Sequence, residues 1–303
     1  MDWNASLKGF SAFMLLELGL SPHSIEAYNR DVKKLISYLS LQDLDINPGQ
    51  IEAEHLRAFI WYLNELGLGP RSQARLISAI KTFFRYLITE ELIQKNPAEI
   101  LDSPKLGRKI PAVLSFDEIQ KMLACIDHST DHGVRNRAML ETLYACGLRV
   151  SERIELRLSN TLLDIGFVKV IGKGNKERIV PIGEEACKHI GLYLEGVRRR
   201  MMNIHPDHKN MLFLNRRGKK LTRVHVFMVV KELAKQANIQ KTVSPHTFRH
   251  SFATHLIEGG ANLKAVQDML GHESIITTEI YTHLDTEYLR DTILNFHPSN
   301  KRG

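Results

Sequence analysis

Hydrophobic residues recur at helical spacing through most of the first hundred positions. A proline in a first turn and a glycine after a last apolar position, as at Pro22 and Gly67, are typical of helix starts and ends. Helices are predicted over residues 4–19, from 21 to at least 39, 52–66 and 71–89, with a short fifth helix near 90–94. The pattern therefore predicts a helical first part of the chain.

The fourth predicted helix has two distinct faces. Its apolar face carries Leu76, Ile80, Phe83, Phe84 and Leu87. A stripe of basic and hydroxyl side chains follows helical spacing on another face, at Arg71, Arg75, Ser78, Thr82 and Arg85. Such a stripe suits phosphate contacts in a groove, although an ordinary solvated face has the same pattern. We take Arg71, Arg75 and Arg85 as candidate DNA-binding residues.

The hydrophobic period changes in the second part of the chain. Ser115 and Glu118 form a capping-box pattern at a helix start, and another helix is predicted from about 134 to 146. Strands are predicted at Leu163, Ile165 and residues 167–171, with a returning strand over 177–182. From residue 184 onward the pattern is again mostly helical. The second part is therefore expected to be helical with a small sheet.

The length of 303 residues suggests two domains. Residues 102–111 carry two prolines, a glycine and three basic residues, a composition typical of a linker. We therefore predict a helical domain over 1–103, a linker over 104–111 and a second domain over 112–303.

Charge and composition narrow the function classes. The formal net charge is +7, and residues 1–105 hold 11 basic against 13 acidic residues, whereas the remainder holds 30 against 21. The basic excess in the second part permits nucleic-acid binding without proving it. No apolar run approaches the ~20 residues that cross a bilayer, and the three cysteines have no paired spacing. A cytoplasmic protein with reduced thiols and no membrane association is expected.

Six residues offer the groups needed to break a DNA strand without a metal. Charge gathers on the non-bridging phosphate oxygens in the transition state, and planar guanidinium groups match those oxygens best. A histidine can complete the clamp, a general acid can protonate the leaving 5′-oxygen, and a tyrosine can hold the phosphate covalently. The candidates are Arg149, Lys173, His246, Arg249, His272 and Tyr281.

Local spacing supports this grouping, although each residue taken singly has a structural alternative. His246 and Arg249 are three apart and share a helix face, and Gly271 is a natural helix C-cap just before His272. A lone tyrosine is more often a packed aromatic, and a lone turn lysine such as Lys173 is usually only a turn residue. Histidines could also hold zinc, but the chain has no His-Glu-x-x-His motif and no cysteine ligand set.

The order and local sequence of these segments resemble the tyrosine recombinase (phage-integrase) family, and the whole chain resembles its bacterial Xer site-specific recombinases. The matching segments are residues 144–152, 170–178, 244–256, 259–261, 266–272 and 277–283. The first part resembles the family's DNA-clamping domain. The resemblance implies a mainly α fold with a small antiparallel β-sheet in the second domain. It implies a helical N-terminal core-binding (SAM-like) domain and a mixed α/β catalytic domain.

The resemblance also implies roles for individual residues. Arg149 and Arg249 would clamp the scissile phosphate, and His246 and His272 would hydrogen-bond to it. Lys173 would protonate the 5′-oxygen, and Tyr281 would attack to give a 3′-phosphotyrosyl link. Glu152 matches the acidic position that supports the first arginine, and His250 matches a helix position behind the site. No cofactor or metal is expected. Cys146 and Arg153 depart from the small hydroxyl and aliphatic residues common in the family.

The expected partner is a double-stranded DNA recombination site, bound by a tetramer that exchanges strands through a Holliday junction. A related recombinase could share the tetramer, and a DNA translocase could regulate it. The C-terminal helix would dock an apolar face on a neighbouring subunit through Tyr288, Leu289, Ile293, Leu294 and Phe296, or pack back on its own domain. Truncation after Leu284 would then weaken assembly.

Three functions remain open beside chromosome dimer resolution. They are a mobile-element or phage integrase of the same family, a type IB topoisomerase with the same chemistry, and a catalytically inactive DNA-binding homologue. The match of the first part to Xer proteins argues against the topoisomerase. The complete set of six catalytic candidates argues against the inactive homologue.

Overall fold

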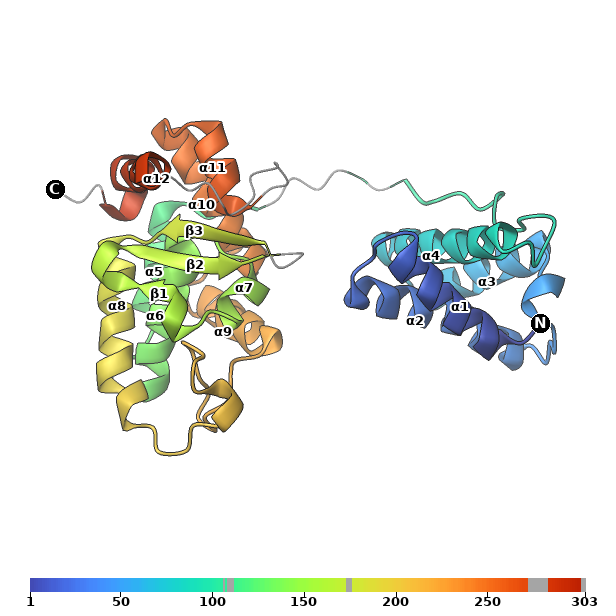
Figure 1. The fold of residues 1–303 in the computed structure, drawn as a ribbon, viewed down its shortest axis with the longest axis horizontal. Coiled ribbons are helices and arrows are strands. Elements are labelled where there is room, and N and C mark those ends of the chain that lie inside the picture. Colours follow the sequence, from blue (N-terminus) through green and yellow to red (C-terminus); the bar gives the residue numbers. More distant parts are fainter. Residues whose placement is uncertain (106, 108–111, 173–175, 272–282, 301–303) are drawn as a thin grey trace. The chain divides into compact units, whose positions relative to one another are not determined.

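Figure 1 shows the fold in the computed structural model, which describes residues 1–105, 107, 112–172, 176–271 and 283–300, with the side chains of 283–287 left out. The chain divides into two compact units, Met1–Lys109 and Ile110–Gly303. The expected fold class is confirmed: helices dominate both units, and the second also holds a small antiparallel sheet. Within these described residues, no helix combines the length and the apolar character needed to cross a membrane.

Four helices build the first unit, as the hydrophobic pattern predicts. They are α1 (Trp3–Leu16), α2 (Pro22–Leu41), α3 (Ala53–Glu65) and α4 (Pro70–Thr89). Ser21 caps α2, and Pro22 occupies its first turn. The five predicted apolar positions of α4 are all buried in one core with α1, α2 and α3. Burial of that stripe leaves four of the five residues of the predicted polar face exposed, whereas Thr82 is buried and donates to the carbonyl of Ser78.

The prediction of a short fifth helix near residues 90–94 is wrong. Glu91 takes a left-handed backbone conformation with φ of 55°, and the Leu92 amide donates to the carbonyl of Leu87 over 2.8 Å. This bond closes the C-terminus of α4 and turns the chain away from the helix axis, so the following residues form turns.

The second unit combines helices with one three-stranded sheet. Its helices are α5 (Phe116–Ala124), α6 (Asp131–Ala145), α7 (Val150–Ile154), α8 (Glu184–Gly196), α9 (Arg223–Gln236), α10 (Pro245–Gly259), α11 (Leu263–Leu270) and α12 (His283–Phe296). The capping box at Ser115 and Glu118 is confirmed at the start of α5. Helix α6 packs against α8 and α10, and α11 and α12 lie beside strand β3 (Figure 1).

The sheet has the order β1–β2–β3, from β1 (Thr161–Leu162), β2 (Phe167–Ile171) and β3 (Glu177–Pro181). The predicted hairpin is confirmed, with Val168 opposite Val180 in an antiparallel register. The strand expected at Leu163 and Ile165 is wrong, because these residues form a 3-10 turn that ends at Gly166 with φ of 73°. Alternation along β3 points Arg178 and Val180 inward, which matters for the site.

Helix α12 packs back on its own domain. Leu289 and Ile293 are buried in the core of the second unit, and Phe296 packs against that core, whereas Tyr288 and Leu294 are exposed. Three of the five predicted docking residues thus pack on the core of their own chain, as in the alternative expectation, and docking on a neighbouring subunit stays a prediction. Truncation after Leu284 would consequently remove core residues, and it cannot isolate an effect on assembly.

Candidate active site

A sharp turn between α6 and α7 places the first candidate arginine. Gly147 follows α6 with φ of 55°, a conformation that favours glycine. A Cβ atom at this position would lie 2.4 Å from the ring of Phe252 in α10, so no side chain fits. The turn leads directly into α7, whose N-cap residue is Arg149. The backbone of this turn therefore fixes where Arg149 begins.

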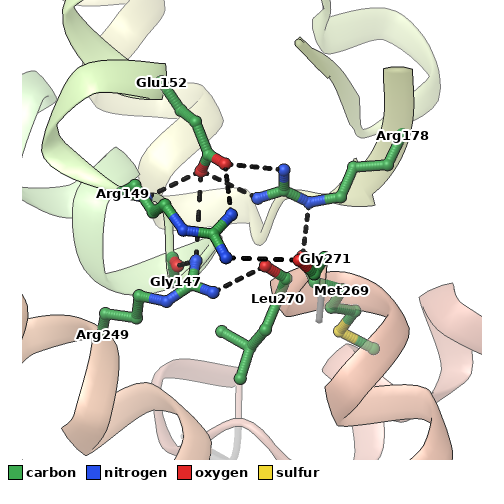
Figure 2. Close-up of polar contacts among 8 residues, drawn as sticks. All are labelled: Gly147, Arg149, Glu152, Arg178, Arg249, Met269, Leu270 and Gly271. Carbon is green, nitrogen blue, oxygen red and sulfur yellow. Dashed lines mark hydrogen bonds and ion pairs between the residues drawn. The ribbon is translucent and has the colours of Figure 1, made fainter. Parts of the chain in front are cut away.

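Glu152 is the centre of a cluster of three arginines (Figure 2). Its Oε1 accepts from Nη1 of Arg149 at 2.8 Å and from Nη1 of Arg178 at 2.9 Å. Its Oε2 accepts from the Arg149 amide at 2.8 Å and from Nη2 of Arg178 at 2.9 Å. Nη1 of Arg249 lies 4.0 Å from the same oxygen. One carboxylate thus faces three guanidinium groups, which leaves an excess of positive charge at the site.

The C-terminal end of α11 supplies three backbone carbonyls to the same arginines. Arg178 donates through Nε to Met269 over 2.8 Å, Arg249 through Nη2 to Leu270 over 2.6 Å, and Arg149 through Nη2 to Gly271 over 3.2 Å. The last carbonyls of a helix have no partner within the helix and carry partial negative charge. The three guanidinium groups therefore satisfy these carbonyls with hydrogen bonds, and they hold the C-terminal end of α11 against α7, β3 and α10 (Figure 2).

Exposure separates the three arginines. The side chain of Arg149 is 35% exposed, whereas those of Arg249 and Arg178 are 10% and 7% exposed. Arg149 is thus the arginine most open to an anion from solvent, and Arg249 lines the same place from deeper in α10.

Glu152 and Arg249 are both charged at neutral pH, although the cluster favours the ionised form of Glu152 and disfavours that of Arg249. Burial raises the pKa of Glu152, but hydrogen bonds and charges from Arg178 and Arg149 outweigh it and leave the pKa below its ordinary value. Burial, and then the charge of Arg149, lower the pKa of Arg249 to about 10. At neutral pH the carboxylate is therefore ionised and Arg249 is protonated. Such a preorganised set of donors suits a ligand with concentrated negative charge.

The structure brings only part of the predicted catalytic set together. Arg149, Glu152 and Arg249 form one cluster, and His246 lies exposed one turn before Arg249 on α10. His250 is also exposed, and within the described ranges no hydrogen bond or ion pair joins it to the cluster. Lys173, His272 and Tyr281 lie outside the described residues. The chain continues toward His272 from Gly271, which caps α11 with φ of 64°.

The candidate DNA-binding residues of the first unit lie on α4 as expected. Arg71 and Arg85 are exposed. Arg75 binds the buried carboxylate of Asp31, with Nη1 to Oδ2 at 2.9 Å and Nη2 to Oδ1 at 3.2 Å. Its side chain is still 41% exposed, so it holds α2 against α4 and also reaches the surface. A role of these three residues in DNA binding stays a prediction.

Arg178 is the residue that sequence reasoning missed. It stands in a matching segment, but no role is predicted for it from the sequence. One signal could have revealed it: on an amphipathic returning strand, the inward positions are Arg178 and Val180, and a charged residue facing a core requires a buried partner. Glu152 is that partner, and a single sequence does not show the pairing.

The chain belongs to the phage integrase family. Residues 112–288 match the Phage integrase family itself, and residues 7–91 match the Phage integrase, N-terminal SAM-like domain. It is 40% identical to the tyrosine recombinase XerD of Listeria innocua over 296 residues, which cover 97% of this chain and 99% of the relative. It is 42% identical to the tyrosine recombinase XerD of Staphylococcus aureus N315, over 96% of this chain and 98% of the relative.

Solved structures agree with this assignment. The XerH site-specific recombinase bound to its difH substrate in a pre-cleavage complex is 25% identical, with a TM-score of 0.67 over 82% of this chain and 74% of that one. A lambda integrase dimer bound to a core site shares the fold, with a TM-score of 0.69 at 18% identity over 90% and 96% of the two chains. The chain is therefore a tyrosine site-specific recombinase, an enzyme of DNA recombination.

Proposed function

We propose that this recombinase resolves chromosome dimers by cutting and rejoining DNA at a specific site through a 3′-phosphotyrosyl intermediate and a Holliday junction. The observation that carries the chemistry is the cluster of three arginines around one carboxylate, with Arg149 partly open to solvent. The full-length similarity to relatives named XerD supports the chromosomal role over a mobile-element role.

The residues divide the reaction among them. Arg149 and Arg249 bind the non-bridging oxygens of the scissile phosphate, where charge grows in the transition state. His246 and His272 add hydrogen bonds to the same oxygens. The Tyr281 hydroxyl loses its proton to solvent, and its oxygen forms a bond to phosphorus while the bond to the 5′-oxygen breaks. The Lys173 ammonium group gives one of its protons to the leaving 5′-oxygen. Rejoining runs the same steps in reverse, so no external energy source is needed.

The proposal extends to assembly and location. Four subunits bind two DNA sites in the cytoplasm, with a paralogous recombinase as a candidate partner and a DNA translocase as a candidate regulator. Arg71, Arg75 and Arg85 of α4 contact the DNA backbone, and their exposed positions on one helix support this role. Surplus positive charge in residues 106–303 supports a second contact with DNA from the catalytic domain.

A nicked suicide substrate tests the chemistry. The nick lets the 5′-hydroxyl product diffuse away, so a covalent protein–DNA complex accumulates and is visible on a denaturing gel. We expect the wild-type chain to form this complex on its site, alone or with its partner recombinase. Tyr281→Phe should bind the site equally well and form no complex, because it lacks the attacking oxygen.

The outcomes separate the competing functions. No complex from the wild type, with and without a partner recombinase, on a tightly bound site would favour an inactive DNA-binding homologue. Relaxation of supercoiled DNA that lacks any specific site would favour a topoisomerase. Cleavage of the ends of a mobile element, with no reaction at a chromosomal site, would favour an integrase.

A further inference from the structure

The geometry points to Arg178 as a positioning residue for the reaction: it holds Glu152 and the C-terminal end of α11, and through them it sets the guanidinium of Arg149. This inference rests on the proposed function. Its first support is the two parallel hydrogen bonds from Nη1 and Nη2 of Arg178 to Oε1 and Oε2 of Glu152, both 2.9 Å (Figure 2). Such a paired contact fixes the carboxylate in one orientation.

Burial excludes a direct role for Arg178 in binding phosphate. Its side chain is 7% exposed, against 35% for Arg149. Three of its donors are engaged by Glu152 and by the carbonyl of Met269. Glu152 in turn orients the guanidinium of Arg149, because its Oε1 accepts hydrogen bonds from Nη1 of both Arg178 and Arg149. Arg178 therefore acts on the substrate through Glu152 and Arg149.

The second support is the contact of Arg178 with α11. Its Nε donates to Met269, two residues before the cap residue Gly271. A Cβ atom at Gly271 would lie 3.2 Å from Cδ and Nη1 of Arg178. This guanidinium is thus packed against the point from which the chain continues toward His272 and Tyr281. One side chain joins the acidic centre of the cluster to the start of the segment that carries the predicted nucleophile.

A double-mutant cycle between Arg178 and Glu152 tests the inference. The four proteins are wild type, Arg178→Met, Glu152→Gln and the double variant. Two quantities are measured for each: the single-turnover rate of covalent complex formation at saturating protein, and the Kd for the DNA site. Lys169→Met is the matched control, because Lys169 lies in the same hairpin and loses an ion pair to Glu177 that is partly exposed.

We expect Arg178→Met to lower the maximal rate by about 100-fold, the size of effect seen when one preorganised donor is lost. Its Kd should stay within about threefold, because the contacts that hold DNA elsewhere remain. The double variant should be about as slow as the slower single variant, since the two residues act as one unit. Lys169→Met should change neither quantity.

Other outcomes overturn the inference in distinguishable ways. An unchanged maximal rate in Arg178→Met, or a double variant whose losses multiply, would overturn the positioning role while leaving the proposed function intact. No covalent complex from the wild type would overturn the proposed function and this inference with it. If Arg178→Met does not bind DNA because it fails to fold, Arg178→Lys replaces it in the cycle. That variant keeps the charge and one donor but not the paired contact, and an undiminished rate with it would equally overturn the role.

Discussion

The backbone carbonyl of Gly147 accepts a hydrogen bond of 2.8 Å from Nη1 of Arg249. The turn that precedes α7 is thereby joined to α10 over a separation of 102 residues. Since Arg149 begins α7 and Arg249 lies in α10, this bond sets the spacing of the two arginines proposed to hold the phosphate. The conformation of Gly147 is thus a condition of the site as well as of the fold.

We predict that Gly147→Ala destabilises the protein by about 2 to 4 kcal/mol, from the left-handed backbone and from overlap with Phe252. Gly166→Ala is the matched control. Gly166 has φ of 73°, but the nearest atom to an added Cβ is a carbonyl oxygen at an ordinary 3.7 Å. The control should therefore lose only about 1 kcal/mol. Urea denaturation followed by circular dichroism measures both, and equal losses would contradict the packing argument.

A second prediction concerns Lys173, the proposed proton donor. Lys173→Ala should slow covalent complex formation by about 100-fold or more, because the 5′-oxygen leaves poorly without a proton. A substrate with sulfur in place of the bridging 5′-oxygen should restore most of the rate, because a thiolate leaves without protonation. The measurement is the rate ratio between the two substrates for wild type and variant. A variant that stays slow on the sulfur substrate would rule out Lys173 as the acid.

Arg153 leads to a prediction about stability. It is fully buried in α7, and its guanidinium has no hydrogen-bond partner among the described residues. The guanidinium carbon lies over the ring of Phe213, 5.7 Å from the ring centroid. Burial, and then the charge of Arg135, lower its pKa to about 9. At neutral pH a buried charge is therefore largely uncompensated, a costly arrangement.

We predict that Arg153→Leu stabilises the protein by about 1 to 4 kcal/mol, because an apolar side chain avoids that desolvation cost. The same change at Arg135 should destabilise it, because Arg135 donates to the carbonyl of Leu214 and to Asn136 from a buried position. Thermal and urea unfolding of both variants checks the contrast. A loss of stability in Arg153→Leu would show that the guanidinium has a partner in solution.

The sequence predicts the regular elements well where periodicity is strong. Helix α4 is an example, since its apolar stripe is long and unbroken and all five predicted positions are buried. The prediction of a helix near residues 90–94 fails because the sequence does not indicate that Glu91 takes a left-handed backbone conformation. The sequence also leaves the packing of α12 undecided, because the apolar pattern is the same whether the helix packs on its own domain or on a neighbouring subunit.

The candidate site divides in a similar way. Arg149 and Arg249 are predictable because their residue type matches the chemistry, and Glu152 is predictable from the family resemblance. The role of Arg178 is not predictable, since it depends on a partner 26 residues away and on a backbone carbonyl of α11. Pairings at such separations are properties of the folded chain, and residue type alone does not specify them.

The last prediction concerns pH and His297, which follows α12. Its side chain is 1% exposed and lies against the rings of Tyr144 and Phe252. Burial, and then the charge of His255, lower its pKa from 6.5 to about 3. The folded chain therefore holds fewer protons at this residue than the unfolded chain between these two values. Stability from this group is complete above about pH 6.5 and is lost as the pH falls toward about 3.

When the unfolded chain binds one proton more than the folded chain, the free energy of unfolding changes by about 1.4 kcal/mol per pH unit. His297→Phe keeps an aromatic ring at this position and removes the titrating group, so its slope between about pH 6 and pH 4 should be smaller by that amount. His189, which is half-buried and also has a lowered pKa, contributes equally to both proteins and cancels in the comparison. Urea denaturation at several pH values gives both slopes. Identical slopes would mean that His297 titrates alike in the folded and unfolded chains, against the burial that the structure shows.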